Sequence, residues 1–272
     1  MRPIVALLTD FGGQDHYVGA VKGAVLAACP EATVVDVAHE LPPHDVEAAA
    51  LCLASCFRAF PAGSVFLAVV DPGVGSERRP LALEVAGYRF VGPDNGTFTL
   101  VLGDQTAAHI RQITNAGLYR YEVSATFHAR DIFGPVAGHL ARGLPLDEVG
   151  PEVADPVLFG VPALRALDAG EWEATVIHVD RFGNLTTNLT SAQLDAILAP
   201  VDGDPTEIVV VVEGVVLPYV RTYSDVPEGE ACALMGSSGR LEVAVSRGNA
   251  SRLLGALKGT AVRVRQVAAL GG

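Results

Sequence analysis

The sequence has no run of basic residues. Its 272 residues include 19 Lys and Arg against 31 Asp and Glu, which gives a formal net charge of −12 at pH 7. Proteins that bind nucleic acid gain affinity from Lys and Arg clustered against phosphates, so this charge balance argues against a nucleic-acid partner. A cationic small molecule would suit such a surface, but acidity also serves solubility alone, and that simpler reason is the commoner one.

Cysteines are few and widely spaced, at Cys29, Cys52, Cys56 and Cys232. Neither a disulfide framework nor a metal-ligand spacing is present, and the seven histidines add none. Cys52 and Cys56 lie four residues apart in an apolar helical pattern, which places them on one helix face. We expect buried thiols in a reducing compartment and a site without a metal ion.

Long apolar runs are also missing. Residues 4–8 form a run that is too short for a signal peptide, and later runs are strand-length, well short of the roughly 18 residues of a membrane-spanning helix. We therefore expect a cytoplasmic protein with no membrane partner. Residues 10–13, after the first predicted strand, lack a G-x-G-x-x-G fingerprint, which argues against a nicotinamide-dependent dehydrogenase.

The first half of the chain alternates short apolar runs with helical periodicity. Strands that alternate with helices favour an α/β fold, in which a largely parallel sheet is covered on both faces. The predicted strands are residues 3–9, 33–38 and 65–70, and the predicted helices are residues 16–28, 46–57 (with Asp45 as cap) and 131–142.

The pattern changes after residue 142. Residues 143–170 contain four prolines and little periodicity, which is typical of a connection between domains. Short apolar runs separated by Gly, Pro and Asp follow, and they predict a compact all-β barrel or sandwich. We expect an α/β domain over residues 1–160 and a smaller β domain over 161–272. The predicted elements of the second domain are strands 174–179, 208–212, 215–220, 232–234, 241–245 and 260–264, and helix 191–198.

Two carboxylates directly follow predicted strands. Asp10 comes after strand 3–9, and Asp71 comes after strand 65–70. Parallel sheets bind ligands beyond the carboxyl ends of their strands, so both residues are candidates for a site. Asp10 could hold a ribose diol, since two carboxylate oxygens match two vicinal hydroxyls, or it could cap the segment that follows.

Arg78 and His128 are further candidates. Asp71 opens the segment DPGVGSERR, whose glycines allow a tight turn and a close approach to a ligand. Arg78 can fold back onto Asp71, either in a site or as the surface ion pair of an ordinary turn. His128 stands near the start of a predicted helix. It could be an acid, a base or an orienting donor, or it could complete a structural hydrogen-bond network.

The β-rich half adds two polar segments, DRFGN (180–184) and SSGRLE (237–242). Phe182 could stack on a base, while Asn184, Ser237 and Glu242 could form hydrogen bonds with a polar ligand. Each segment could equally be a hairpin turn.

Six segments occur in order along the chain: TDFG (9–12), VDPGVGSERR (70–79), GPDNG (92–96), TFHARDIF (126–133), DRFGNLTTN (180–188) and SSGRLEVAVSRGNA (237–250). Together they resemble the S-adenosyl-L-methionine (SAM) hydroxide adenosyltransferase family, the adenosine-forming SAM hydrolases that are related to fluorinases and chlorinases. The resemblance runs almost end to end, and six ordered motifs are far more specific than any one of them.

The resemblance implies a Rossmann-like N-terminal domain, a C-terminal β-barrel and a homotrimer. Each active site would lie between the N-terminal domain of one subunit and the C-terminal domain of its neighbour. Asp71, Arg78 and His128 would position and polarise a water or hydroxide, and Asp10 would hold the ribose hydroxyls. The adenosine and methionine portions would be held by Asn184, Ser237, Glu242 and the backbone near Val245, with Asp180 and Phe182 at nearby ligand-contacting positions.

The implied reaction is hydrolysis of SAM at C5′, which gives adenosine and L-methionine. No cofactor is expected, because a sulfonium is already a good leaving group. Halogenation is a weaker alternative, since the halogenating relatives have an uncharged residue at the position of Asp71, and a carboxylate would repel a halide in a dry pocket. Fluorinases also carry a long insertion in the stretch that matches residues 81–92. The other alternative is a non-catalytic adenosine- or SAM-binding sensor.

Overall fold

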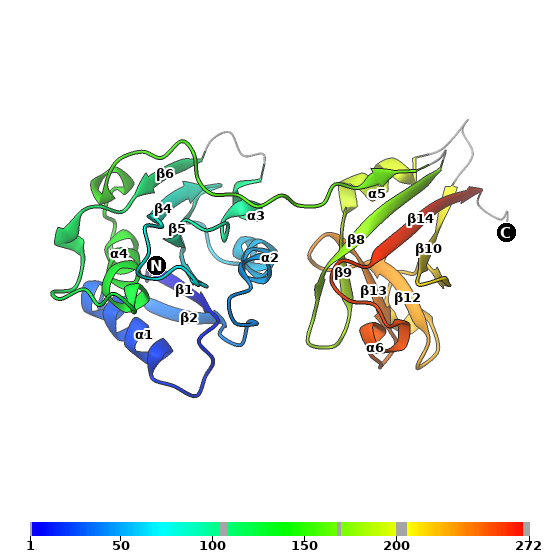
Figure 1. The fold of residues 1–272 in the computed structure, drawn as a ribbon, viewed down its shortest axis with the longest axis horizontal. Helices are drawn as coiled ribbons and strands as arrows, with labels where there is room; N and C mark the ends of the chain where they lie inside the picture. The colour runs from blue at the N-terminus through cyan, green and yellow to red at the C-terminus, as the bar shows by residue number, and fades with distance from the viewer. Residues whose placement is uncertain (1, 104–107, 168–169, 200–205, 269–272) are drawn as a thin grey trace. The chain divides into compact units, whose positions relative to one another are not determined.

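A computed structural model of the chain describes residues 2–103, 108–167, 170–199 and 206–268 (Figure 1). The chain divides into two compact units, Met1–Phe159 and Gly160–Gly272, which we call unit 1 and unit 2. Unit 1 combines a sheet with helices, and unit 2 consists mainly of antiparallel strands. Each unit has its own hydrophobic core.

Unit 1 is built on a six-stranded sheet with the strand order β2-β1-β3-β5-β4-β6. The first four strands in this order run parallel, and β4 is antiparallel to both of its neighbours. The sheet is therefore largely parallel, as the sequence predicts. The strands are β1 (Ile4–Thr9), β2 (Thr33–Ala38), β3 (Val65–Val69), β4 (Pro80–Val85), β5 (Tyr88–Pro93) and β6 (His109–Gln112).

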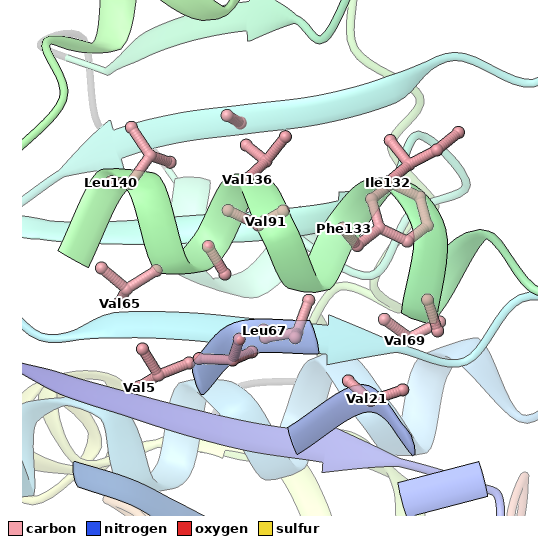
Figure 2. Close-up of a cluster of buried hydrophobic side chains, with 14 of the residues drawn as sticks. Val5, Val21, Val65, Leu67, Val69, Val91, Ile132, Phe133, Val136 and Leu140 are labelled. Atoms are coloured by element: carbon pink, nitrogen blue, oxygen red, sulfur yellow. The ribbon is translucent and has the colours of Figure 1, made fainter. Parts of the chain in front are cut away.

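Helices cover both faces of this sheet. Alternate residues of β1 belong to different cores: Val5 and Leu7 pack under α1 (Tyr17–Ala28) and α4 (Gly134–Ala141), and Ala6 and Leu8 pack under α2 (Val46–Cys56) and α3 (Thr99–Leu102). Figure 2 shows side chains of α4, among them Val136 and Leu140, above the strands. Burial of one such aliphatic side chain contributes about 1.5–3 kcal/mol.

The starts of two helices differ in how well the sequence predicts them. The Asp45 carboxylate accepts the backbone N–H of Ala48, so the predicted cap of α2 is confirmed. The helix predicted over residues 131–142 begins earlier, with a π-helical turn at Ala129–Phe133 that leads into α4. Such turns are frequent at functional sites, and this one follows His128 directly.

Unit 2 is an antiparallel sheet with the strand order β11-β10-β14-β8-β9-β13-β12, to which β7 adds beside β8. A bridge between Tyr219 and Ala233 brings the segment after β11 to β12, so the sheet is nearly closed into a barrel. Its elements are β7 (Arg165–Ala166), β8 (Glu171–Val179), β9 (Leu185–Thr190), α5 (Ser191–Ile197), β10 (Thr206–Val212), β11 (Val215–Pro218), β12 (Ala231–Met235), β13 (Arg240–Val245), α6 (Ala250–Leu254) and β14 (Ala261–Ala268).

The predicted fold class, an α/β unit with a largely parallel sheet followed by a smaller β-barrel, is confirmed. Strands β4, β5, β6, β7 and β9 lie outside the predicted strands. Two of the four thiols, Cys29 and Cys232, are buried as expected, whereas Cys52 and Cys56 are only partly buried. Within the described residues, no helix is both long and apolar enough to cross a membrane.

Candidate active site

Asp10 and Asp71 lie at the same edge of the parallel sheet. Asp10 follows the last residue of β1, and Asp71 comes two residues after the end of β3. The two strands are parallel neighbours in which Thr9 pairs with Val69. The topology therefore brings both carboxylates to the carboxyl edge, where ligands of such sheets bind.

Asp71 forms a buried, two-point ion pair with Arg78. The Arg78 Nε donates to Asp71 Oδ1 at 2.9 Å, and its Nη2 donates to Oδ2. Only 5% of the Asp71 side chain and 9% of the Arg78 side chain are exposed, so this is not the surface ion pair of an ordinary turn. The guanidinium carbon also lies 5.1 Å from the centre of the buried Phe133 ring. The two parallel N–H···O bonds give the pair a defined geometry.

His128 is the third member of this cluster. Its Nδ1 accepts a hydrogen bond from Arg78 Nη2 at 2.9 Å, and an accepting Nδ1 requires the neutral ring with its proton on Nε2. Burial lowers the pKa of His128 below its ordinary value, and the positive charge of Arg78 lowers it further. His128 therefore offers an Nε2–H donor at neutral pH.

Gly75 allows the two segments of the cluster to meet. Its φ is +78°, and a Cβ placed there would lie 2.5 Å from the carbonyl oxygen of Ala125, three residues before His128. Any other residue would push the Asp71 loop away from the His128 segment. The second glycine of DPGVG thus has a definite structural function.

The GPDNG motif holds the backbone directly before Asp71 in place. The Asn95 side chain donates to the carbonyl of Val70 at 2.9 Å, directly before Asp71. Gly92 has no space for a side chain, since its Cβ would lie 2.2 Å from the carbonyl oxygen of Ala68 in β3. Asp94, which is buried, accepts from Arg79, so the two adjacent arginines have different partners.

A pocket of about 50 Å³ lies beside Asp71 and His128. A polar cavity needs only about 10–15 Å³ to hold one water molecule, so the pocket has room for a small nucleophile. Its other lining residues were not singled out from the sequence, although they stand inside the motifs or next to them. They are Phe11, Val69, Val74, Thr126, Phe127 and Ala129.

Asp10 accepts the backbone N–H of His44 with Oδ2 at 2.8 Å. It does not cap α1, which begins after His16 without a side-chain cap. His44 has a φ of +67°, an uncommon conformation for a residue with a side chain. The carboxylate is thus fixed by one oxygen, and it stays partly exposed at the sheet edge.

The candidates of unit 2 lie on turns of the barrel. Asp180 Oδ1 accepts the backbone N–H groups of Phe182 and Asn184, and its Oδ2 accepts from the Asn184 side chain. Asp180 therefore builds the turn, as the hairpin interpretation holds. The turn presents Phe182, whose exposed fraction is 74%. A large exposed aromatic ring is suited to stacking on a planar ligand.

Glu242 has a partner that the sequence did not reveal. Tyr223 donates to Glu242 Oε1 at 2.7 Å from the turn Tyr223–Asp225. Burial raises the pKa of Glu242, and the nearby charge of Asp180 raises it further. Ser237 is exposed on the β12–β13 turn, and Val245 is buried, so only the backbone of Val245 is open to a ligand role.

The described residues contain no group of three or more His, Cys, Asp or Glu side chains that could hold a metal ion. The cluster in unit 1 offers a carboxylate, a guanidinium and an imidazole group.

The sequence is similar to known proteins over most of its length. The sequence model of the SAM hydroxide adenosyltransferase N-terminal domain matches residues 5–150, and that of the C-terminal domain matches residues 174–263. The chain belongs to the SAM hydroxide adenosyltransferase family. The two matched domains correspond to unit 1 and unit 2, and they contain all the candidate residues named above.

Curated relatives within and beside this family cover the chain almost completely. A protein of Thermus thermophilus named (R)-S-adenosyl-L-methionine hydrolase is 44% identical over 97% of this chain and 100% of its own length. A protein of Salinispora tropica with the same name is 39% identical over 96% of this chain and 97% of its own length. A fluorinase of an Actinoplanes species is 30% identical over 89% of this chain and 91% of its own length.

Solved structures share the fold over nearly the whole chain. The crystal structure of an uncharacterized conserved protein from Thermotoga maritima is 34% identical and superposes with a TM-score of 0.87, covering 96% of this chain and 99% of its own. The crystal structure of a conserved hypothetical protein from Thermus thermophilus is 40% identical with a TM-score of 0.75, covering 98% of this chain and 100% of its own.

Proposed function

We propose that this protein hydrolyses SAM at C5′ and releases adenosine and L-methionine. The observation that carries the proposal is the Asp71–Arg78–His128 cluster, which lies beside a pocket with room for a water molecule. Family membership and the names of the hydrolase relatives support the substrate.

The reaction is a substitution by water. The water oxygen forms a bond to C5′ while the C5′–S bond breaks, and its electron pair stays on sulfur as the neutral thioether of methionine. One proton of the water leaves to base or solvent, and the oxygen becomes the 5′-hydroxyl of adenosine. The sulfonium needs no acid or metal to depart, so we propose that no cofactor takes part.

The cluster is suited to present the nucleophile. Asp71 can accept one water proton, while the Nε2–H of His128 can donate to the water oxygen, so the lone pair aimed at C5′ is fixed. Arg78 holds the Asp71 carboxylate at two points and fixes the position of His128. In-line attack also requires the oxygen within about 3–3.5 Å of C5′, which a small rigid pocket favours.

Other candidates would hold the nucleoside and the amino acid. We propose that Asp10 binds the ribose hydroxyls with the carboxylate oxygen that His44 does not occupy. Phe182 would stack on adenine. Asn184, Ser237, Glu242 and the backbone at Val245 would bind polar groups of adenosine or methionine, and Asp180 would shape their turn.

Purified protein incubated with SAM tests the activity directly. Because the hydrolase relatives are named for the (R) form, each sulfonium epimer should be supplied separately. Chromatography should detect adenosine and methionine in equal amounts, at a rate that a chelator leaves unchanged. Water labelled with heavy oxygen should place its label in the 5′-hydroxyl of adenosine. Binding of SAM without turnover would indicate the non-catalytic sensor. In the presence of halide, a halogenated nucleoside that contains no heavy oxygen from water would indicate the halogenase.

A carboxylate at the pocket favours hydrolysis over halogenation. Asp71 lines the pocket, and its charge would repel a halide where little solvent screens it. The halogenase alternative therefore has no observation in its favour beyond the similarity to fluorinases at 28–30% identity.

We also propose a cytoplasmic homotrimer in which unit 1 of one subunit and unit 2 of its neighbour form each site. The division of the candidate residues between two units, with Phe182 exposed on unit 2, supports a shared site. Light scattering would measure the number of subunits in the assembly. Fractionation of cells would show in which compartment the protein lies. At a SAM concentration at which Asp71→Ala chains and Glu242→Ala chains are each inactive alone, co-refolding the two should restore roughly a quarter of the sites if subunits share them. No recovery would mean that each site belongs to one chain.

A further inference from the structure

A chain of polar side chains runs through unit 1 next to the candidate site. Lys22 Nζ donates to Asp36 Oδ2 at 2.7 Å, and Asp36 Oδ1 pairs with His39 Nε2 at 2.9 Å. The other ring nitrogen of His39, Nδ1, lies 2.8 Å from the hydroxyl of Thr9, which is fully buried at the end of β1. None of these four residues belongs to the site described above.

The chemistry of the partners fixes the direction of the hydrogen bonds. An ionised carboxylate only accepts, so His39 Nε2 donates to Asp36. When the ring is neutral, the lone pair on its Nδ1 accepts the hydroxyl proton of Thr9. This leaves the Thr9 oxygen free to accept the backbone N–H of Phe11, which lies 3.3 Å away. The chain of hydrogen bonds therefore ends on the backbone beside Asp10.

The loop of residues 9–13 receives its other hydrogen bonds from the same neighbouring segment. The backbone carbonyl of His39 accepts the N–H of Gly12 at 2.8 Å, and the Glu40 carboxylate accepts the N–H of Gly13 at 2.9 Å. His39 thus holds the loop with its side chain and with its main chain. The loop in turn carries Asp10 and Phe11, one at the ribose-binding edge and one in the wall of the water pocket.

A Thr–His–Asp series resembles the arrangement that activates a nucleophilic hydroxyl. Thr9 has no exposed surface, so its hydroxyl cannot reach a substrate. The series must act through the loop that it holds.

We propose that His39 is a positioning residue, which holds loop 9–13 in the shape that lets Asp10 bind ribose and Phe11 wall the water pocket. The inference rests on the proposed function for the meaning of Asp10, and it adds a residue to which no catalytic or binding role has been assigned. A residue that only stabilised the fold would change the melting temperature without changing ligand affinity.

Two pairs of variants test the proposal. Thr9→Val keeps the volume and removes the hydroxyl, whereas Thr9→Ser keeps the hydroxyl. His39→Asn places an acceptor near the position of Nδ1, whereas His39→Gln places its amide near Nε2 and leaves Thr9 without an acceptor. Ser64→Ala is the matched control, since Ser64 is a buried hydroxyl at the opposite end of β3 that donates to the carbonyl of Pro61 at 2.7 Å.

The readouts are the melting temperature, the Kd for adenosine by calorimetry, and KM and kcat for SAM. Thr9→Val and His39→Gln should raise the adenosine Kd and the SAM KM roughly tenfold, as expected for one lost buried hydrogen bond. Thr9→Ser and His39→Asn should stay within about twofold of the wild type, because each keeps the Thr9–39 contact. Ser64→Ala should lower the melting temperature with unchanged Kd and KM.

Unchanged Kd and KM in Thr9→Val and His39→Gln, at the same thermal destabilisation as Ser64→Ala, would overturn the positioning role. If Thr9→Val does not fold, the comparison of His39→Asn with His39→Gln decides in its place, and equal affinities of these two variants overturn the proposal. A wild type that binds adenosine but does not turn over SAM removes the proposed function instead. The adenosine affinities of the variants still test His39 in that case.

Discussion

The two units hold their candidate residues in different ways. In unit 1, Asp71, Arg78 and His128 form hydrogen bonds with one another, and both members of the ion pair are buried. In unit 2, Asp180 and Asn184 bond within their own turn, while Phe182 and Ser237 face solvent. Unit 1 therefore has a preformed arrangement of charges, and unit 2 has groups that a ligand can still engage.

This difference matches two separate requirements. Groups that stabilise a reacting centre are most effective when they are already oriented, because no free energy is then spent on reorganisation during the reaction. Groups that recognise a ligand gain affinity from surface that becomes buried on binding, as the Phe182 ring would. We therefore expect substitutions in the Asp71–Arg78–His128 cluster to act mainly on kcat, and those in unit 2 mainly on affinity and stability.

Asp71→Asn should have the largest effect. The amide keeps the shape of the carboxylate but leaves the buried Arg78 charge without its partner. We expect kcat to fall roughly 10²–10⁴-fold, as when a general acid or base is lost. The unfolding free energy should fall by about 3–5 kcal/mol, as when one member of a buried ion pair is removed. Stopped assays and urea unfolding measure the two quantities.

Asp155→Asn is the matched control for this prediction. Asp155 pairs with Arg79, next to Arg78 in sequence, but 83% of its side chain is exposed. It should keep wild-type kcat and stability. If Asp71→Asn behaves like Asp155→Asn, the cluster of unit 1 is not a reacting centre and the contrast between the units fails.

Gly75→Ala should have the next largest effect. The new Cβ would meet the carbonyl oxygen of Ala125, so the Asp71 loop must move away from the His128 segment. We expect kcat to fall by up to about 10²-fold, the effect of a displacement near 1 Å in a catalytic group. Gly63→Ala is the control, because Gly63 has a similar φ of +84° but open space around it. Equal kcat values for both variants would mean that close approach at Gly75 is unimportant.

Activity should fall on the acid side of its pH profile only at a pH below the ordinary pKa of histidine. Burial and the charge of Arg78 lower the pKa of His128 below the ordinary 6.5, so the ring stays neutral as the pH falls past that value. Activity should decline only at lower pH, when Nδ1 takes up a proton and can no longer accept from Arg78. A profile of kcat/KM against pH measures this limb, and His128→Asn, which keeps an acceptor but does not titrate, should lack it. A limb at or above pH 6.5 contradicts the assignment.

Glu242→Gln should have the smallest effect, a change in thermal stability. The pKa of Glu242 is raised above 4.5 in the fold, so its neutral form stabilises unit 2 below pH 4.5, and this contribution is lost as the pH rises through the raised pKa. Glutamine stays neutral throughout and can still accept from Tyr223. We expect the Glu242→Gln variant to melt at a slightly higher temperature than the wild type at pH 7. Below pH 4.5 the two melting temperatures should be equal. Calorimetry measures both. A constant difference at all pH values would show that Glu242 does not titrate in this way.

Much of the fold is predictable because periodicity reports burial directly. The buried strand β3 and the helix that Asp45 caps follow from apolar runs and one cap residue. The β4–β5 hairpin does not, because its turn is Ala86-Gly87, with both residues at positive φ. Such turns are normally recognised in a sequence by Asn or Asp at the first position, and alanine gives no such signal. This short turn lies in the stretch where the fluorinases are expected to carry their insertion.

The sequence does not predict strand β9, for a different reason. Three consecutive polar residues in it, Thr186, Thr187 and Asn188, are buried. Asn188 accepts the N–H of Thr175 and donates to the carbonyl of Pro162, and Thr187 donates to the carbonyl of Leu241. Their polar groups are satisfied inside the barrel by partners that are distant in sequence, so composition alone indicates a loop.

The candidate site shows the same limit. The sequence places Asp10 and Asp71 at strand ends, because that position depends only on local pattern. It does not reveal Tyr223 beside Glu242 or His39 beside Thr9, since both contacts depend on how separate segments pair. The burial of the Asp71–Arg78 pair, which excludes a surface ion pair, likewise depends on the whole fold.

The native thiols have a practical consequence for measurement. Burial raises the pKa of all four cysteines, that of Cys56 to about 11, so few thiolates exist at neutral pH. Because the thiolate is the form that reacts with alkylating dyes, the natural thiols should react with them more slowly than exposed cysteines do. Cysteines introduced at the exposed Tyr121 and Val216, as Tyr121→Cys and Val216→Cys, would carry a fluorophore pair, one on each unit. Each dye would then report ligand binding at its own unit in solution without removal of a single natural cysteine.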